Sequence, residues 1–142
     1  MTDTALAMPE VSASDTIRTT GILHFTIGAR DHVAASKFYS EVLGCKIMRI
    51  GERYAFMDCR GSYFVLAKMP NHVNPNLPGD DAHHHAFMVE PEEFDRALAI
   101  MKARGVEMIK YSDQGHVTFP GRHAYFHDAD VNCIEIIDLY KN

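Results

Sequence analysis

Apolar and polar residues alternate over residues 22–27, and the same period-two pattern returns at residues 84–89. Side chains of a β-strand point alternately to its two faces. In the second run Phe87 and Val89 form the apolar face, which places His84 on the opposite face. The same reasoning places His24 opposite the apolar residues of the first run. We therefore predict two strands, each carrying a histidine on the face turned away from the core.

A helical period follows each of these strands. After Asp31, a suitable N-cap, apolar residues recur at the i, i+3, i+4, i+7 spacing, and Gly44 follows as a residue suited to a left-handed C-terminal position. The second helix is predicted to begin at Pro91, which is followed by two glutamates that favour a first turn, and to end at Gly105.

The two halves of the chain repeat the same order of elements. Gly44 lies 20 positions after His24, and Gly105 lies 21 positions after His84. Three short strands are expected after each helix, at residues 46–50, 53–59 and 62–68 and at residues 107–111, 122–127 and 132–139. The pattern indicates an internal duplication of a βαβββ unit. We expect an α+β fold in which two tandem modules form a curved mixed sheet around a cleft.

Domain boundaries follow from the same pattern. Residues 1–20 are rich in Thr, Ser and Ala and are expected to be a flexible leader, since they lack the apolar segment of a signal peptide. Residues 21–139 form one domain. Module one spans residues 21–68 and module two spans residues 82–139. Residues 69–81, with three prolines and three asparagines, are predicted to be a linker.

Composition narrows the classes of function. A net charge of −5 without a Lys/Arg cluster argues against a nucleic-acid partner. No apolar run is long enough to span a bilayer. The three cysteines are widely spaced and include no CxxC pair, which favours reduced thiols and a cytoplasmic location.

One carboxylate points to metal chemistry. Glu135 lies inside an apolar strand, opposite the core-facing Ile134 and Ile136. Burying such a group costs several kcal/mol unless it is paired or binds a cation. If His24 and His84 converge on Glu135, they form a site of two imidazoles and one carboxylate. That ligand set suits Fe(II), which we favour, and also Mn(II), Zn(II) or Ni(II).

Three segments together resemble the vicinal oxygen chelate superfamily, which includes glyoxalase I, fosfomycin-resistance proteins, bleomycin-binding proteins and extradiol dioxygenases. The segments are residues 22–26, residues 84–87 with the helix after them, and residues 121–135. The resemblance covers residues 21–139. It implies that His24, His84 and Glu135 bind the metal, that the substrate is a small molecule, and that the chain is a homodimer.

The resemblance also implies roles near the metal. Thr26 is similar to a ligand-contacting Thr of the fosfomycin enzymes. Tyr125, ten positions before Glu135, is similar to a substrate-contacting Tyr, and His116, 19 positions before Glu135, to a histidine near the metal of extradiol enzymes. We assign Tyr125 and His116 as catalytic. His123 and His127 alternate onto the face of Tyr125. They are assigned with Thr26 to substrate binding, unless that face is simply solvated.

Departures from the family pattern limit the activity. The strand at residues 62–68 has no carboxylate, which disfavours glyoxalase I chemistry, and the metal triad argues against a bleomycin binder. The acid–base histidine of dioxygenases, expected near residues 60–62, is absent. His72 could replace it only if the linker folds over the metal.

Three functions remain as hypotheses. The main expectation is an extradiol-type dioxygenase acting on a small chelated diol. The alternative is a thiol transferase or hydrolase acting on a small electrophile, with Glu52 as a candidate base for water. The third is a non-catalytic small-molecule binder.

Overall fold

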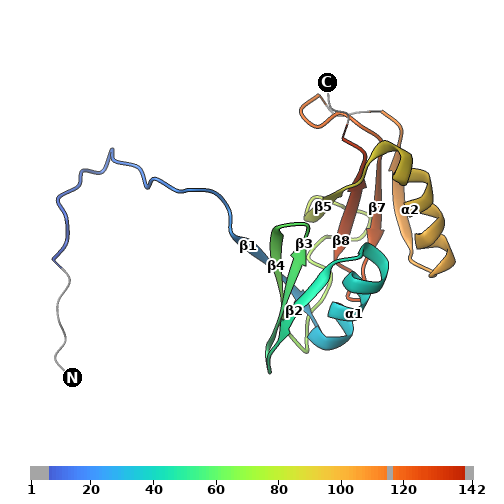
Figure 1. Ribbon diagram of the computed structural model, residues 1–142, viewed down its shortest axis with the longest axis horizontal. Coiled ribbons are helices and arrows are strands. Elements are labelled where there is room, and N and C mark those ends of the chain that lie inside the picture. Colours follow the sequence, from blue (N-terminus) through green and yellow to red (C-terminus); the bar gives the residue numbers. More distant parts are fainter. Residues whose placement is uncertain (1–6, 115–116, 140–142) are drawn as a thin grey trace.

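Ten elements form two βαβββ modules in the computed structural model, which describes residues 7–114 and 117–139 (Figure 1). Module one contains β1 (His24–Ala29), α1 (His32–Leu43), β2 (Lys46–Ile50), β3 (Tyr54–Cys59) and β4 (Ser62–Lys68). Module two contains β5 (His84–Met88), α2 (Pro91–Ala103), β6 (Met108–Ser112), β7 (His123–His127) and β8 (Cys133–Ile137). The predicted α+β duplication is confirmed.

Each module contributes one four-stranded mixed sheet, with the orders β1-β4-β3-β2 and β5-β8-β7-β6. The first strand of each module pairs in parallel with the last strand, and the other pairs are antiparallel. Within the described residues the strands therefore form two sheets rather than one continuous sheet. His24 and His84 begin the equivalent edge strands of the two sheets.

The duplication extends to an irregularity in the second strand of each module. The β2–β3 register shifts between Ile47 and Arg49, and the β6–β7 register shifts between Met108 and Lys110. A β-bulge of this kind inserts one extra residue and re-aims the side chains after it. Its repetition means that positions across the two sheets correspond one to one.

The signals that begin and end α1 are found where the sequence places them, whereas α2 ends at Ala103 with Arg104 rather than Gly105 as its C-cap. The Asp31 carboxylate accepts hydrogen bonds from the backbone N–H groups of Val33 and Ala34, at 3.0 and 3.1 Å. Gly44 adopts φ 68° and closes α1. β2 and β4 have the expected bounds, and the bounds of the other strands differ from the expected ones by one or two residues. β1 begins at His24 and runs to Ala29 because β4 offers it partners only from Tyr63 to Lys68.

The helix-facing sides of the two sheets share one hydrophobic core. Phe64 of β4 and Phe87 of β5 pack edge to face with ring centroids 5.9 Å apart, and Tyr39 of α1 lies against both rings. Phe94 of α2 belongs to the same cluster and is fully buried. The modules are thus joined through their helix-facing sides, which leaves the other face of each sheet open.

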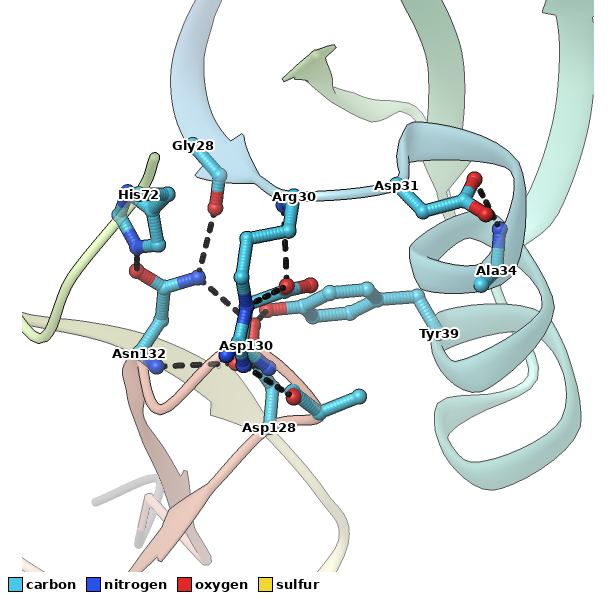
Figure 2. Close-up of polar contacts among 10 residues, drawn as sticks. Gly28, Arg30, Asp31, Ala34, Tyr39, His72, Asp128, Asp130 and Asn132 are labelled. Atoms are coloured by element: carbon cyan, nitrogen blue, oxygen red, sulfur yellow. Dashed lines mark hydrogen bonds and ion pairs between the residues drawn. The ribbon is translucent and has the colours of Figure 1, made fainter. Parts of the chain in front are cut away.

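A buried polar cluster adds to this junction (Figure 2). The Asp128 carboxylate, after β7, accepts a hydrogen bond of 2.5 Å from the Tyr39 hydroxyl of module one. It also accepts hydrogen bonds from the backbone N–H groups of Asp130 and Asn132 and from the Asn132 side chain, at 2.8–3.0 Å. Burial and the neighbouring carboxylate hold the pKa of Tyr39 well above its ordinary value.

The turn at residues 128–132, between β7 and β8, contacts module one at two further points. Arg30 pairs with the Asp130 carboxylate at 3.1 Å, and the Asn132 amide donates to the Gly28 carbonyl at 2.9 Å. The His72 ring of the linker donates to the Asn132 side-chain oxygen at 2.8 Å. We call the set of Arg30, Tyr39, Asp128, Asp130 and Asn132 the module clasp.

The faces turned away from the shared core carry both buried side chains and exposed apolar ones. On module one, Tyr54, Phe56 and Tyr63 are 37–41% exposed. On module two, Met88 is 74% exposed. His24 and Thr26 belong to the first face and His84 to the second, as the alternation predicts. We refer to these as the open faces of the two modules.

Gly121 occupies a position that no other residue fits. Its φ is +149°, and a Cβ atom there would overlap the backbone carbonyl of Asp138. Gly121→Ala is therefore expected to lower the free energy of unfolding by roughly 1–3 kcal/mol, as measured by urea denaturation. Gly51→Ala is the control, because its Cβ would lie 3.6 Å from the nearest atom, in ordinary contact. Equal stability of the two variants would contradict the assignment of strain to Gly121.

Residues 7–23, which precede β1, contain no helix or strand and extend away from the modules (Figure 1). No helix in the described part of the chain is long and apolar enough to cross a membrane.

Candidate metal and substrate site

His84 and Glu135 meet on the open face of module two. β5 and β8 run parallel with Ala86 paired to Glu135, so the His84 ring reaches diagonally to the carboxylate. The distance from His84 Nε2 to Glu135 Oε2 is 3.3 Å. Glu135 is 6% exposed although it lies on the open face. The structure thus brings two of the three predicted ligands together from positions 51 residues apart in the chain.

The hydrogen bonding of His84 favours a cation at this point. His84 Nδ1 lies 2.7 Å from the backbone carbonyl of Asp81, which can only accept, so Nδ1 carries the proton. In the neutral ring Nε2 then presents a lone pair toward a carboxylate oxygen. Two acceptors 3.3 Å apart repel each other unless a proton or a cation lies between them. A histidine whose other nitrogen donates to a carbonyl is the usual arrangement of a metal ligand.

Tyr125 lies beside this pair. It is opposite Glu135 across β7 and β8, and its ring meets the His84 ring edge to face at 5.2 Å. Burial, followed by the charge of Glu135 and a hydrogen bond to it, raises the pKa of Tyr125 to about 12. The phenol therefore stays protonated over the physiological pH range and is available as a hydrogen-bond donor.

The two histidines of β7, His123 and His127, lie in different surroundings. His123 Nδ1 is 3.1 Å from Glu135 Oε1, and His123 Nε2 is 3.1 Å from the Gln114 carbonyl. An imidazolium can donate to both oxygens. His127 lies at the other end of β7, opposite Cys133, with Nδ1 3.5 Å from Glu107. The structure thus places His123 in contact with the Glu135 carboxylate, and His127 against Glu107.

His24 is not part of this group within one chain. It lies on the open face of module one, paired in register with Tyr63 and exposed to solvent. Among the described residues, no three His, Cys, Asp or Glu side chains are placed so that they could hold a metal ion. A single chain therefore presents His84 with Glu135 on one open face and His24 on the other.

Other predicted residues are placed as follows. Thr26 is exposed on the face of His24, and Glu52 is exposed in the turn between β2 and β3. His72 is not free to act over a metal, because Asn132 holds its ring and the ring packs on Gly28. His116 lies outside the described residues.

Two charged residues at the site were not predicted from the sequence. Lys110 Nζ lies 4.9 Å from the centre of the Tyr125 ring and forms an ion pair of 2.5 Å with Asp81. Lys110 faces Tyr125 only because the bulge in β6 shifts the register by one residue. The strand pattern alone gives no sign of that bulge. The one available signal for Asp81 is its position three residues before His84.

Comparisons with known proteins agree with this architecture. The sequence profile of the Glyoxalase/Bleomycin resistance protein/Dioxygenase superfamily matches residues 21–136. Fosfomycin resistance protein FosX of Listeria monocytogenes is 24% identical over 118 residues, which are 82% of this chain and 87% of that protein.

Solved structures show the same fold. A crystal structure of the Listeria FosX superposes with a TM-score of 0.73 at 22% identity, covering 87% of this chain and 94% of that chain. A glyoxalase/dioxygenase from Nostoc punctiforme gives a TM-score of 0.72 at 20% identity, covering 91% and 100%.

Proposed function

This chain belongs to the glyoxalase/bleomycin resistance protein/dioxygenase superfamily, and from that premise we propose that it is a divalent-metal-dependent enzyme that opens a small electrophile such as an epoxide. The observation that carries the proposal is the facing of His84 Nε2 and Glu135 Oε2 at 3.3 Å, with His84 Nδ1 committed to a carbonyl. These two atoms have the chemistry of metal ligands, and a cation between them would remove their mutual repulsion.

The third ligand in this proposal is the partner's His24. The module clasp and the shared core fix the two modules of one chain through their helix-facing sides. Both open faces are then left uncovered, and both carry exposed apolar side chains. A two-fold symmetric dimer in which module one of each chain covers module two of the other buries these faces. It also brings His24 of one chain to His84 and Glu135 of the other, and it forms two equivalent sites.

Epoxide opening is supported better than ring cleavage. A crystal structure of a FosX variant contains Mn(II) and 1S,2S-dihydroxypropylphosphonic acid, and this chain superposes on it with a TM-score of 0.72 at 21% identity. A vicinal diol is the product of adding water to an epoxide. The dioxygenase expectation has no comparable support, because the β3–β4 turn, Arg60-Gly61, carries no histidine and His72 is held by Asn132. We therefore favour Mn(II) over Fe(II).

The residues around the proposed metal site would have the following roles. His84, Glu135 and the partner's His24 would hold the metal, which would supply Lewis acidity toward the epoxide oxygen. Tyr125, held protonated, can donate a hydrogen bond to the oxygen on which negative charge develops. Lys110, next to Tyr125, supplies positive charge that would attract an anionic substrate group. Glu52, from the covering module one, is the candidate acceptor of the proton from water.

Metal binding is tested first on the purified chain stripped of metal. Mn(II) at roughly a hundredfold its dissociation constant should stabilise the fold by about 2.7 kcal/mol, seen as a rise in melting temperature. His84→Ala should remove this rise. His83→Ala is the matched control and should retain it, since the exposed His83 side chain lies next in sequence but forms no contact with Glu135 in the described structure. A full Mn(II) response in His84→Ala would refute the ligand assignment.

The reaction is tested with the Mn(II)-loaded protein. Fosfomycin and a set of small epoxides should be converted to diols in water, or to thioethers if a thiol is the required nucleophile. Glu52→Gln separates the two cases, because it should lower hydrolysis but leave thiol addition unchanged. Oxygen uptake with a catechol, without turnover of any epoxide, would overturn the proposal in favour of a dioxygenase.

A further inference from the structure

Two of the three cysteines oppose each other at the end of the β2–β3 ladder. Lys46 pairs with Asp58 and Ile47 with Met57, so the next position of this antiparallel register sets Cys45 against Cys59. Directly opposed residues point their side chains to the same face of a sheet. Both cysteines do so here, because Cys45 belongs to the hydrophobic core and Cys59 packs against it.

The spacing at this position suits a disulfide. The backbone N–H of Cys45 donates to the Tyr39 carbonyl of α1 at 3.1 Å, so it does not donate to Cys59. Opposed residues without mutual hydrogen bonds have Cα atoms about 4.5 Å apart. Disulfides span Cα separations of about 4.4–6.8 Å, so little backbone movement is needed. Both thiols are free in the structure, and each lies near enough to shift the acidity of the other.

The two thiols differ in access and in acidity. Cys45 is 3% exposed, whereas Cys59 is half-buried and lines, with Arg60, a groove between the modules. The interaction with Cys45 lowers the pKa of Cys59 below its ordinary value, with help from Arg60 and against burial and Asp58. The same interaction, together with burial, raises the pKa of Cys45. Thiolate therefore forms on the sulfur that reagents can reach.

We propose that Cys59 and Cys45 form a reversible thiol oxidation site, in which Cys59 reacts with a hydroperoxide and Cys45 resolves the product as an intramolecular disulfide. The Cys59 thiolate attacks one peroxide oxygen and breaks the O–O bond, giving a sulfenic acid and an alkoxide or hydroxide that takes up a proton. The Cys45 sulfur then attacks the Cys59 sulfur, the S–O bond breaks, and water leaves with the Cys45 proton. Two electrons pass from the thiols to the hydroperoxide.

The site is independent of the proposed metal centre. Cys45 and Cys59 face the helix side of their sheet, whereas His24 and Thr26 lie on the open face of module one. Cys59 itself lies on the side of the sheet that dimerisation through the open faces would not cover. The disulfide would tie the end of α1 and the start of β2 to the end of β3.

The test uses the folded, unmodified chain with stoichiometric hydrogen peroxide, followed by alkylation and peptide mapping. The expected product has a mass lower by two hydrogens and contains a Cys45–Cys59 linked peptide that dithiothreitol releases. Cys133, which is 1% exposed, should be alkylated only after unfolding and serves as the internal control. Two free thiols at Cys45 and Cys59 after this treatment, or a disulfide that includes Cys133 or a second chain, would overturn the proposal.

Variants separate the two roles. Cys45→Ala should accumulate a sulfenic acid at Cys59 that dimedone traps, formed more slowly because Cys45 no longer lowers the pKa of Cys59. Cys59→Ala should give neither product. Cys133→Ala should still form the disulfide. Circular dichroism establishes that each variant is folded, and the result with the unmodified chain does not depend on any of them. Dimedone labelling at Cys45 rather than Cys59 would refute the assignment of the reactive sulfur.

Discussion

Two inactive variants, His24→Ala and Glu135→Gln, are expected to regain activity when their chains are mixed. Each change removes one proposed metal ligand. Losing a ligand should weaken metal binding more than losing a residue that is only hydrogen-bonded to a ligand. We therefore expect each change alone to lower metal affinity by more than about 100-fold. In a mixed dimer, the Glu135 of the first variant meets the intact His24 of the second. Random pairing would restore about a quarter of the sites found in the unmodified protein. Bound Mn(II) and epoxide turnover, measured after unfolding and refolding the two chains together, check this.

A second mixture provides the matched control. His84→Ala and Glu135→Gln both lie in module two, so every site of their mixed dimer lacks one ligand. This mixture should stay inactive at the same concentration of mixed dimer, which differently tagged chains make measurable. Recovery in neither mixture, with mixed dimers present, would show that a site is not shared between chains. Equal recovery in both would show that the three residues do not form one ligand set.

Asp128→Ala is expected to cost roughly 3–5 kcal/mol of the free energy of unfolding, the largest loss among the single changes considered. The carboxylate accepts four hydrogen bonds, including that of the Tyr39 hydroxyl, and Asp128 is 6% exposed. Its removal leaves buried donors without acceptors, and each unsatisfied donor costs about 1–3 kcal/mol. Urea denaturation followed by circular dichroism measures the effect.

Two further variants define what Asp128 contributes. Tyr39→Phe removes a single donor and should cost about 1–2 kcal/mol. Glu41→Ala breaks another contact between the modules, the ion pair with Arg104 at 3.6 Å, but that pair is exposed and should contribute less than about 1 kcal/mol. If Asp128→Ala were no more destabilising than Glu41→Ala, the module clasp would not stabilise the junction.

The Tyr39 hydroxyl of the module clasp also predicts that the free energy of unfolding falls at alkaline pH. The pKa of Tyr39 is raised in the folded state, so the folded chain holds this proton more tightly than the unfolded chain. The stability from Tyr39 is complete below the unfolded pKa of about 10 and declines as the pH rises above it. Tyr39→Phe should remove this part of the alkaline loss of stability.

The fold could be predicted from the sequence because its signals are local. The alternation around His24 and His84, the Asp31 cap and the left-handed Gly44 each depend on a few neighbouring residues. The strand ends depend on pairing, since a strand extends only as far as its partner. β1 therefore begins two residues later than the apolar pattern suggested.

The site could be predicted only in part, because it depends on pairing between distant segments. The approach of Glu135 to His84 follows from the faces of two strands, and that approach is present. The position of Lys110 depends on a bulge in β6 that the residue pattern does not indicate. The separation of His24 from the other two ligands depends on how the modules dock, which the strand pattern does not encode. That docking is set by Tyr39, Asp128 and the shared core.

The repeated bulge allows the two modules to be superimposed position by position. This comparison reveals a difference between the modules in their possible metal ligands. Through the pairing of each sheet, Thr26 corresponds to Ala86, and Val65 stands where Glu135 stands. Module one thus has the buried isopropyl group of Val65 at the position where module two has the carboxylate of Glu135. Of these two equivalent positions, only the one in module two carries an anionic donor. In the dimer proposed here, module one would therefore supply a histidine but no carboxylate to the metal, leaving a reactant's oxygen free to act as a further donor.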